Sequence, residues 1–321
     1  MSLSAAEAEA LFGRMLDGGM DDAAIATTLV ELADRGETAE EVAGAVLAMR
    51  ARMIPVKAPA NAIDVCGTGG DGQHSLNVST AVALVVAACG VPVAKHGNRA
   101  ASSKAGGADT LEALGLNLAR ASALAETTLP DLGICFLFAQ AHHPALGRIA
   151  PIRKAMRRRT IFNLLGPLAN PAGVNRQLVG VPNPALIPLY ADAMARLGTE
   201  RAMIVSGAEG LDEISIAGPS HIAAVGLPML GAAITPEDAG LSRHPAEALK
   251  GGDAAYNAAA LRRMLLGEQG AYRDAVLLNS AGALIVAGEV ADWRAGVEEA
   301  AEAIDKGLAN TLLDCWIAAT K

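Results

Sequence analysis

The feature that most restricts the fold of this chain is a change of apolar period after residue 58. Beyond that point, short strand-like runs alternate with longer helix-like runs. The strand-like runs are AIDVC, VPVAKHG, GICFLFA, RQLVGV, RAMIVSG and HIAAVG. This alternation predicts an α/β fold with a mostly parallel central sheet. Ligands of such sheets bind at the carboxyl ends of the strands, so functional residues are expected there.

The first 53 residues, in contrast, show only helical periodicity. Two capping boxes, Ser4 with Glu7 and Thr38 with Glu41, mark helix starts. The proline-containing stretch IPVKAPAN follows and reads as a linker. We therefore predict a small all-helical domain over residues 1–58 and a larger α/β domain over residues 59–321.

Composition narrows the class of protein. The net charge of −8 argues against a nucleic-acid-binding protein. No apolar run approaches the roughly 18 residues that a membrane span needs, and the N-terminus lacks a signal-peptide profile. Cys66, Cys89, Cys135 and Cys315 are far apart and form no CxxC pair. They predict buried free thiols in a protein that works in the cytoplasm.

The stretch AIDVCGTGGDGQHSLNVST combines a strand, a glycine-rich loop and a helix start. Glycines let a backbone approach a phosphate closely, and a helix start offers unpaired N–H groups. Gly67, Gly69 and Gly72 also satisfy the dinucleotide pattern GxGxxG, but no acidic residue follows at the distance that ribose binding needs. The GxxxxGK[ST] pattern of ATP-binding loops is absent. A phosphate site and a purely structural turn remain the two interpretations of this loop alone.

Three further motifs favour the phosphate site. KHGNR, over residues 95–99, places cations at a strand end, and SSKAGGAD supplies a second glycine loop before a helix. EGLDEIS contains the adjacent acids Asp212 and Glu213, which often just face solvent. Near bound phosphates they would be natural Mg²⁺ ligands, because Mg²⁺ prefers carboxylates together with substrate oxygens.

Together these motifs resemble anthranilate phosphoribosyltransferases, in their order and spacing. The resemblance rests on GTGGDG, NVST, KHGNR, SSKAGGAD, HHPALGRIAPIRKAMRRRTIFNLLGPLANPAG, EGLDEIS, PEDAGL, VLLNSAGAL and IDKGLA. It implies transfer of the phosphoribosyl group from phosphoribosyl pyrophosphate to the amine of anthranilate, a step of tryptophan biosynthesis. It also implies Mg²⁺ as cofactor, a homodimer, and a helical domain completed by a mid-chain segment near residues 151–171.

The resemblance assigns residues to each ligand. Those implied for phosphoribosyl pyrophosphate are Gly67, Gly70, Asp71, Ser75, Asn77, Val78, Ser79, Thr80, Lys95, His96, Gly97, Asn98, Arg99, Ala100, Ala101, Ser102, Ser103 and Gly107. Those implied for anthranilate are Gly67, Asn98, His142 and Arg153, and those implied for Mg²⁺ are Ser79, Asp212 and Glu213. A planar guanidinium at residue 153 suits a carboxylate. His96 is the candidate proton acceptor, whereas His143 is expected to be structural or at the surface.

The chain departs from the family pattern at Leu76, at Gln140 and in RKAMRRRT, which replaces a common Glu-Leu-Gly segment. Apart from Arg153, this basic run is expected to be a solvated helix face. Two other functions stay open: a pyrimidine nucleoside phosphorylase, whose lysine–serine phosphate motif is not seen, and a nucleic-acid-binding, non-catalytic relative, whose basic groove the acidic composition disfavours.

Overall fold

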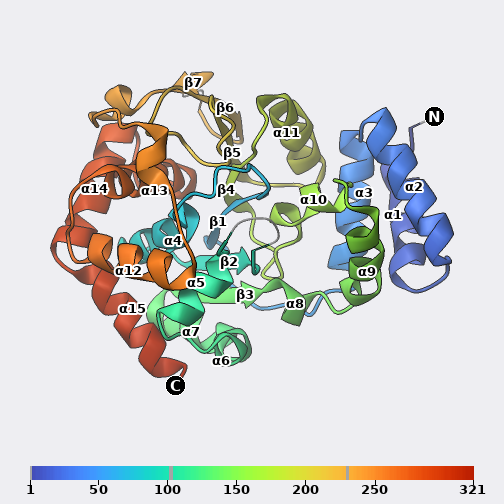
Figure 1. Cartoon of the computed structure of the whole chain (residues 1–321), viewed down its shortest axis with the longest axis horizontal. Coiled ribbons are helices and arrows are strands. Elements are labelled where there is room, and N and C mark those ends of the chain that lie inside the picture. Colours follow the sequence, from blue (N-terminus) through green and yellow to red (C-terminus); the bar gives the residue numbers. More distant parts are fainter. Residues whose placement is uncertain (1, 101–103, 229–230) are drawn as a thin grey trace.

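The computed structural model describes residues 2–100, 104–228 and 231–321. A large unit built around a sheet and a small helical unit lie side by side along the long axis of the molecule (Figure 1). Ala101, Ser102 and Ser103, three residues implied for phosphoribosyl pyrophosphate, lie outside the described residues. No helix in the described part of the chain is long and apolar enough to cross a membrane.

One seven-stranded sheet forms the centre of the large unit, in the order β3-β2-β1-β4-β5-β6-β7. The strands are β1 (Ile63–Gly67), β2 (Val93–Gly97), β3 (Ile134–Phe138), β4 (Arg176–Gly180), β5 (Arg201–Gly207), β6 (Ser220–Val225) and β7 (Ala233–Ile234). The first five in this order pair in parallel, whereas β6 and β7 pair antiparallel. The predicted α/β class with a mostly parallel sheet is confirmed.

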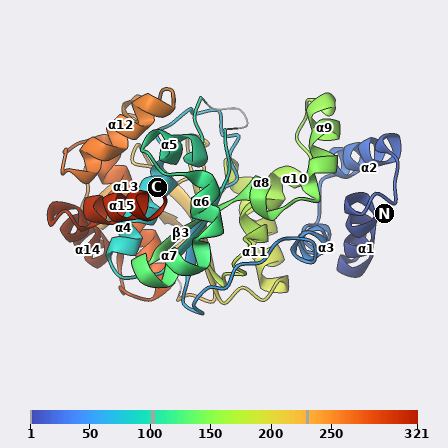
Figure 2. The same cartoon turned by 90° about the horizontal axis from the view of Figure 1, so that it is seen from below.

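Helices cover both faces of the sheet (Figures 1 and 2). Those of the large unit are α4 (Val78–Ala88), α5 (Gly107–Ala113), α6 (Leu118–Ala123), α7 (Ala125–Leu132), α8 (Ala139–His142), α11 (Ile187–Arg196), α12 (Ala254–Leu265), α13 (Ala271–Ala287), α14 (Trp293–Asp305) and α15 (Leu308–Ala319). Short 3₁₀ turns are η1 (Pro167–Ala169), η2 (Pro184–Leu186), η3 (Pro236–Ala239) and η4 (Ala246–Leu249). On one face, α4 and α13 are buried almost throughout, which explains their nearly continuous apolar sequences.

The small unit contains α1 (Ala5–Leu16), α2 (Asp22–Arg35), α3 (Ala39–Arg50), α9 (Leu146–Met156) and α10 (Phe162–Leu165). Both predicted capping boxes are present, at the starts of α1 and α3. Gly44 lets α1 and α3 approach closely, because a Cβ there would lie 2.3 Å from the Ala5 carbonyl oxygen.

The mid-chain segment packs into this helical unit. Phe162 meets Phe12 edge-on with ring centroids 5.7 Å apart, and α9 lies beside α1 and α2. The same apolar cluster continues onto the sheet through Val179 and Ile204. The domain division at residue 58 and its completion by residues 151–171 stay predictions, which this packing supports.

Candidate active site

The sequence motifs meet at the carboxyl edge of the sheet. The glycine loop follows β1, KHGNR closes β2, and EGLDEIS follows β5. β1 lies between β2 and β4 in the centre of the parallel strands, where the chain order reverses. Such a reversal point opens a crevice between the loops of neighbouring strands, and ligands bind there.

The glycine loop has a backbone that other residues adopt only with strain. Gly69, Gly70 and Gly72 have φ values of 72°, 76° and 73°. Gly67 is needed for a different reason, since a Cβ there would lie 2.1 Å from Oδ2 of Asp212. The loop therefore brings its backbone close to the acidic pair, and its N–H groups remain near the crevice.

Substitution of Gly70 tests this loop. Gly70→Val places a β-branched residue at a φ of 76°, which costs about 1–2 kcal/mol or more. The strained loop should bind phosphoribosyl pyrophosphate about tenfold more weakly by titration calorimetry, as roughly 1.4 kcal/mol predicts. Gly173→Val, also at positive φ but in the turn before β4, is the control for strain elsewhere. Equal affinities for the Gly70 variant and the unmodified chain would reduce the loop to a structural turn.

Asp212 and Glu213 face the glycine loop and the start of α4. Oδ2 of Asp212 accepts a hydrogen bond of 2.7 Å from Gly69 N, and Oε1 of Glu213 accepts one of 3.1 Å from Ser79 N. Burial, together with the nearby carboxylate of Asp71, raises the pKa of Asp212, and burial with the charge of Asp212 raises the pKa of Glu213. Repelling, desolvated carboxylates of this kind favour a bound cation.

The described residues contain no cluster of three or more His, Cys, Asp or Glu side chains that could hold a metal by themselves. A carboxylate pair next to a phosphate loop nevertheless fits Mg²⁺, which takes one or two protein carboxylates and completes its shell with water and substrate oxygens.

Lys95 carries its charge into this pocket. Its side chain is 3% exposed, and Nζ donates to the Val65 carbonyl at 2.7 Å and to Ser79 Oγ at 3.3 Å. Asp64, which is fully buried, lies near this ammonium group and accepts a hydrogen bond of 3.1 Å from His96 N. The ammonium group thus joins the Ser79 region to the strand that carries KHGNR.

Asn77 closes the N-terminal end of α4 with an interaction network. Its Nδ2 donates to the Ala105 carbonyl at 3.2 Å, and its Oδ1 accepts from Asn257 Nδ2 at 2.9 Å. A side chain at Gly107 would meet Thr80 Oγ1 at 2.8 Å, so the second glycine loop lies directly against the first helix. The helix start Val78–Thr80 and the second loop are therefore held in one crevice.

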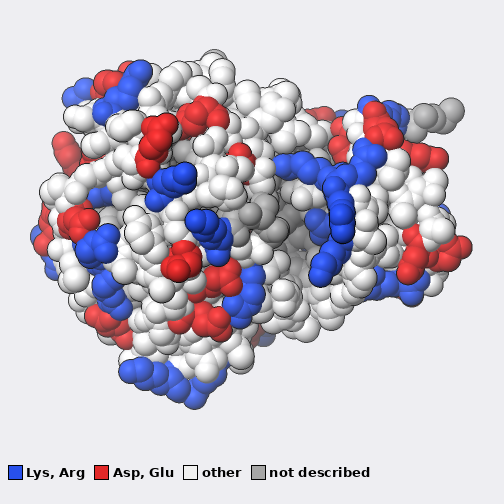
Figure 3. All heavy atoms as spheres, viewed as in Figure 1, with Lys and Arg blue, Asp and Glu red and all other residues white. Residues whose placement is uncertain are grey.

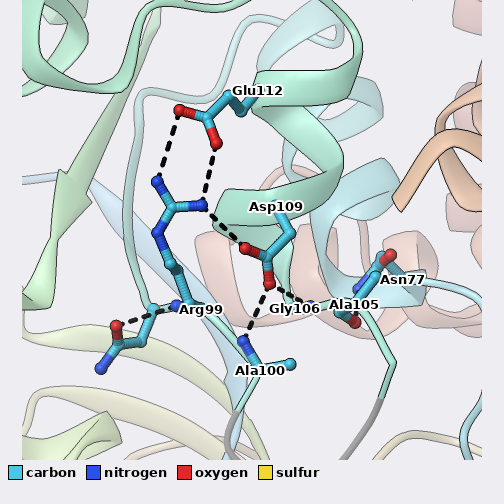
Figure 4. A network of polar contacts seen from close by, with 8 residues as sticks. Asn77, Arg99, Ala100, Ala105, Gly106, Asp109 and Glu112 are labelled. Atoms are coloured by element: carbon cyan, nitrogen blue, oxygen red, sulfur yellow. Dashed lines mark hydrogen bonds and ion pairs between the residues drawn. The ribbon is translucent and has the colours of Figure 1, made fainter. Parts of the chain in front are cut away.

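Arg99 is tied to α5 rather than projecting freely. Its guanidinium bonds Asp109 and Glu112, each at 2.8 Å, and lies 5.7 Å from the ring centroid of Phe138 (Figure 4). Asp109 also accepts from Ala100 N and Gly106 N. This network fixes the loop after β2, so Arg99 shapes the backbone here and its charge is already paired with carboxylates.

Three histidines are buried beside the crevice. Nδ1 of His96 lies 3.0 Å from the Gly166 carbonyl, and Nδ1 of His142 lies 3.0 Å from the Ile54 carbonyl. His143 packs against His96 with ring centroids 5.2 Å apart. His143 was expected to be structural or at the surface, and its 5% exposure agrees with the structural alternative. The sequence contained a signal for this position, because His143 follows His142 directly in HHPALGR, one of the motifs that resemble the family.

Burial makes the rings of His96 and His143 poor bases. It lowers the pKa of His96 to about 3 and that of His143 to about 4, and neighbouring histidines add to both shifts. A neutral His96 ring that donates through Nδ1 presents Nε2 as a hydrogen-bond acceptor. Among the described residues, no protein group donates a hydrogen bond to this Nε2. His96 as proton acceptor stays a prediction.

These shifts predict how stability depends on pH. In the folded chain the pKa of His96 is about 3, so its ring stays neutral between pH 6.5 and 4, whereas in the unfolded chain its pKa is about 6.5 and the ring takes up a proton. The free energy of unfolding therefore falls as the pH drops from about 6.5 toward 4. His96→Asn keeps an N–H donor and cannot titrate, so its Tm should fall less steeply over this interval. The control is His221→Asn at an exposed position. Parallel Tm curves for His96→Asn and the unmodified chain would contradict a neutral buried ring.

Arg153 lies on α9, across the crevice from the sheet. Nη2 bonds Asn163 Oδ1 at 3.4 Å, and the guanidinium lies 5.5 Å from the ring centroid of Phe162. Burial lowers its pKa, and among the described residues no carboxylate pairs with it. A half-buried cation without an ionic partner fits an incoming carboxylate.

Comparison with known proteins identifies this arrangement. The helical bundle domain of a glycosyl transferase family matches residues 1–53, and the a/b domain of that family matches residues 59–310. An anthranilate phosphoribosyltransferase of Novosphingobium aromaticivorans is 69% identical over 99% of this chain and 96% of its own length. The chain belongs to the anthranilate phosphoribosyltransferase family. The corresponding protein of Sphingopyxis alaskensis is 64% identical over 97% of this chain and 94% of its own length.

Solved structures of anthranilate phosphoribosyltransferases share the whole fold. That from Thermus thermophilus has a TM-score of 0.93 and 42% identity, and covers 100% of this chain and 96% of its own. One from Saccharomyces cerevisiae, in complex with phosphoribosyl pyrophosphate and Mg, has a TM-score of 0.90 and 28% identity. It covers 99% of this chain and 93% of its own. The predicted family and enzyme class are confirmed, and the two alternative functions are not supported.

Proposed function

We propose that this chain transfers the phosphoribosyl group of phosphoribosyl pyrophosphate to the amine of anthranilate, with release of pyrophosphate, in tryptophan biosynthesis. The observation that carries the proposal is the double contact of the acidic pair: Asp212 with the glycine loop and Glu213 with the start of α4. Cation-binding groups and phosphate-binding backbone are thereby held in one crevice.

The phosphate end of the substrate would lie against the glycine loop and the start of α4. Ser79, Asp212 and Glu213 would hold Mg²⁺, which supplies charge neutralisation for the departing pyrophosphate. The ammonium group of Lys95, 3.3 Å from Ser79 Oγ, would add a fixed positive charge beside the departing pyrophosphate. A yeast relative contains both Mg and this substrate, which supports the same use here.

The acceptor end would lie between the sheet edge and α9. Arg153 is suited to the carboxylate, and the amine of anthranilate is neutral at pH 7, so it needs orientation more than deprotonation. Nε2 of His96 can accept a hydrogen bond from such an amine. His142 and Asn98 are the other residues that the resemblance implies for anthranilate. A yeast relative in complex with 4-fluoroanthranilate, with a TM-score of 0.88, supports an aromatic acid as acceptor.

The test is direct. The chain is mixed with Mg²⁺, phosphoribosyl pyrophosphate and anthranilate, and the loss of anthranilate fluorescence is followed over time. The expected result is a decay that requires all three additions and releases one pyrophosphate for each anthranilate consumed. A decay with inorganic phosphate and a nucleoside instead, or none with any mixture, would overturn the proposal.

We further propose that the enzyme is a homodimer that acts in the cytoplasm. The resemblance to the family supports the dimer, and the cysteines, which form no CxxC pair, support the cytoplasm. Sedimentation at two protein concentrations would measure the first, and a fluorescent fusion in the source cell would measure the second. A single species with the mass of one chain would contradict the dimer.

A further inference from the structure

The basic run at the end of α9, expected to be a solvated face, lies beside the crevice. Residues 153–159 contain Arg153, Lys154 and three consecutive arginines, and no Asp or Glu. Lys and Arg side chains gather along the hollow between the two units, on the side where Figure 1 draws α9 and α10 (Figure 3). The chain as a whole carries a net charge of −8, so this concentration of positive charge is local.

Arg159 brings the run to the substrate loop. Its Nη1 lies 3.5 Å from the Gly70 carbonyl oxygen, and a Cβ built on Gly70 would lie 3.2 Å from the same Nη1. Gly70 belongs to the sheet unit, whereas residue 159 follows α9 of the helical unit. The guanidinium therefore spans the crevice and stands beside the loop proposed to bind pyrophosphate.

Arg157 occupies a backbone conformation that disfavours arginine. It caps α9 with φ 50° and ψ 31°, in the left-handed region where glycine is the usual residue. His74 is the other non-glycine residue with positive φ among the described residues, and it lies in the glycine loop itself. A strained arginine at a helix end, where glycine would fit without strain, indicates a use for its charge.

The charges of Arg157 and Arg159 are not balanced by carboxylates at ion-pair distance within the described ranges, whereas Arg158 pairs with Asp34 of α2. Glu37 senses the charge of Arg159, but burial raises the pKa of Glu37 and weakens it as a counterion. Both proposed substrates are anions, and the net charge of the chain opposes their approach. A cluster of unbalanced cations at the mouth of a crevice raises the rate of anion capture.

We propose that Arg157 and Arg159 form a cationic lip that captures phosphoribosyl pyrophosphate and guides it onto the glycine loop. The inference rests on the function proposed above. The lip would act on association, before the substrate reaches Lys95 and the acidic pair, and would leave the chemical step unchanged. Salt should suppress its effect, because screening shortens the reach of exposed charges from about 10 Å at 0.1 M to about 3 Å at 1 M.

The test combines Arg157→Gly with Arg159→Gln. Arg157→Gly relieves the left-handed strain, so by itself it should raise Tm by about 1–3 °C, which excludes misfolding as a cause. The double variant should lower kcat/KM for phosphoribosyl pyrophosphate roughly three- to tenfold in 25 mM KCl, and less than about twofold in 500 mM KCl, with kcat unchanged. Arg294→Gln on α14 removes one positive charge, as Arg159→Gln alone does, from the far side of the large unit (Figure 1), and should match the unmodified chain at both salts.

Every other outcome contradicts the proposal that Arg157 and Arg159 form a cationic lip. Equal kcat/KM for the double variant and the unmodified chain would leave a solvated face. A loss that persists undiminished in 500 mM KCl, or a fall in kcat, would indicate direct contact in the reaction. A loss as large in Arg294→Gln would indicate net charge alone. If the unmodified chain lacks transferase activity, the proposed function fails, and the lip is tested separately by binding of inorganic pyrophosphate with Mg²⁺ at both salts, where the same salt-dependent loss is required.

Discussion

Replacing Asp212 with Asn and Glu213 with Gln together is expected to lower Mg²⁺-dependent turnover by about 100-fold or more, as loss of several kcal/mol of charge stabilisation implies. Amides keep the shape of the carboxyl groups and their acceptor oxygens. Gly69 N and Ser79 N, which donate to them at 2.7 Å and 3.1 Å, therefore keep their partners. The variant loses the negative charge and little else.

Stability measurements separate this effect from misfolding. Burial and mutual repulsion raise the pKa of both carboxylates, so the charged pair opposes folding when no cation is present. Without Mg²⁺, the Tm of the double variant should equal or exceed that of the unmodified chain. The adjacent acids Glu298 and Glu299 on α14 supply the control, as Glu298→Gln with Glu299→Gln. Full activity of the Asp212 and Glu213 variant at limiting Mg²⁺ would remove these residues from the metal site.

The sequence predicted the fold where local pattern and environment agree. β1 is buried along Ile63–Cys66 and α13 along nearly all of its length, and both have the apolar continuity that such burial requires. The capping boxes at Ser4 and Thr38 are local devices within three residues of sequence, so they could be read directly. The antiparallel β6 was not distinguished from its parallel neighbours, because strand direction is set by the connection and not by the strand residues.

Contacts between distant segments were beyond the reach of the sequence pattern. Asp64 looked like part of an apolar strand, yet it accepts hydrogen bonds from His96 N and Asn170 Nδ2 and lies near Lys95. The cysteines were all expected to be buried, which is wrong for Cys315, since α15 exposes it. A lone cysteine on an amphipathic helix gives no signal of which face it occupies.

The residues implied for each ligand were found by resemblance, and physical chemistry explains only some of them. The glycines have geometry that demands their identity, as the 2.1 Å approach at Gly67 and the φ of 76° at Gly70 show. Arg99 differs, because Asp109 and Glu112 already pair with its charge and hold the loop in place. Its contact with phosphoribosyl pyrophosphate stays a prediction. The assignments to substrates stay predictions until variants such as the following are measured.

Arg153→Ala is expected to raise KM for anthranilate by about 10- to 150-fold, and to leave the affinity for phosphoribosyl pyrophosphate nearly unchanged. The guanidinium is half-buried over Phe162 and has one long hydrogen bond, to Asn163 at 3.4 Å. A bidentate pair with an ionised carboxylate is worth roughly 1.5–3 kcal/mol, which gives this range. Phosphoribosyl pyrophosphate would be held independently by the glycine loop and Lys95. Steady-state kinetics with each substrate varied in turn measure both effects.

Conservative and neighbouring variants decide what Arg153 does. Arg153→Lys should recover only part of the loss, because an ammonium group cannot reproduce the planar fork of donors. Lys154→Ala, at the exposed adjacent position of α9, should leave both KM values unchanged. If both substrates weaken equally in Arg153→Ala, Arg153 supports the packing of α9 and the anthranilate site lies elsewhere. If Lys154→Ala raises KM for anthranilate as strongly, the positive charge of the run acts on this substrate without a specific pair, and the carboxylate contact at Arg153 is excluded.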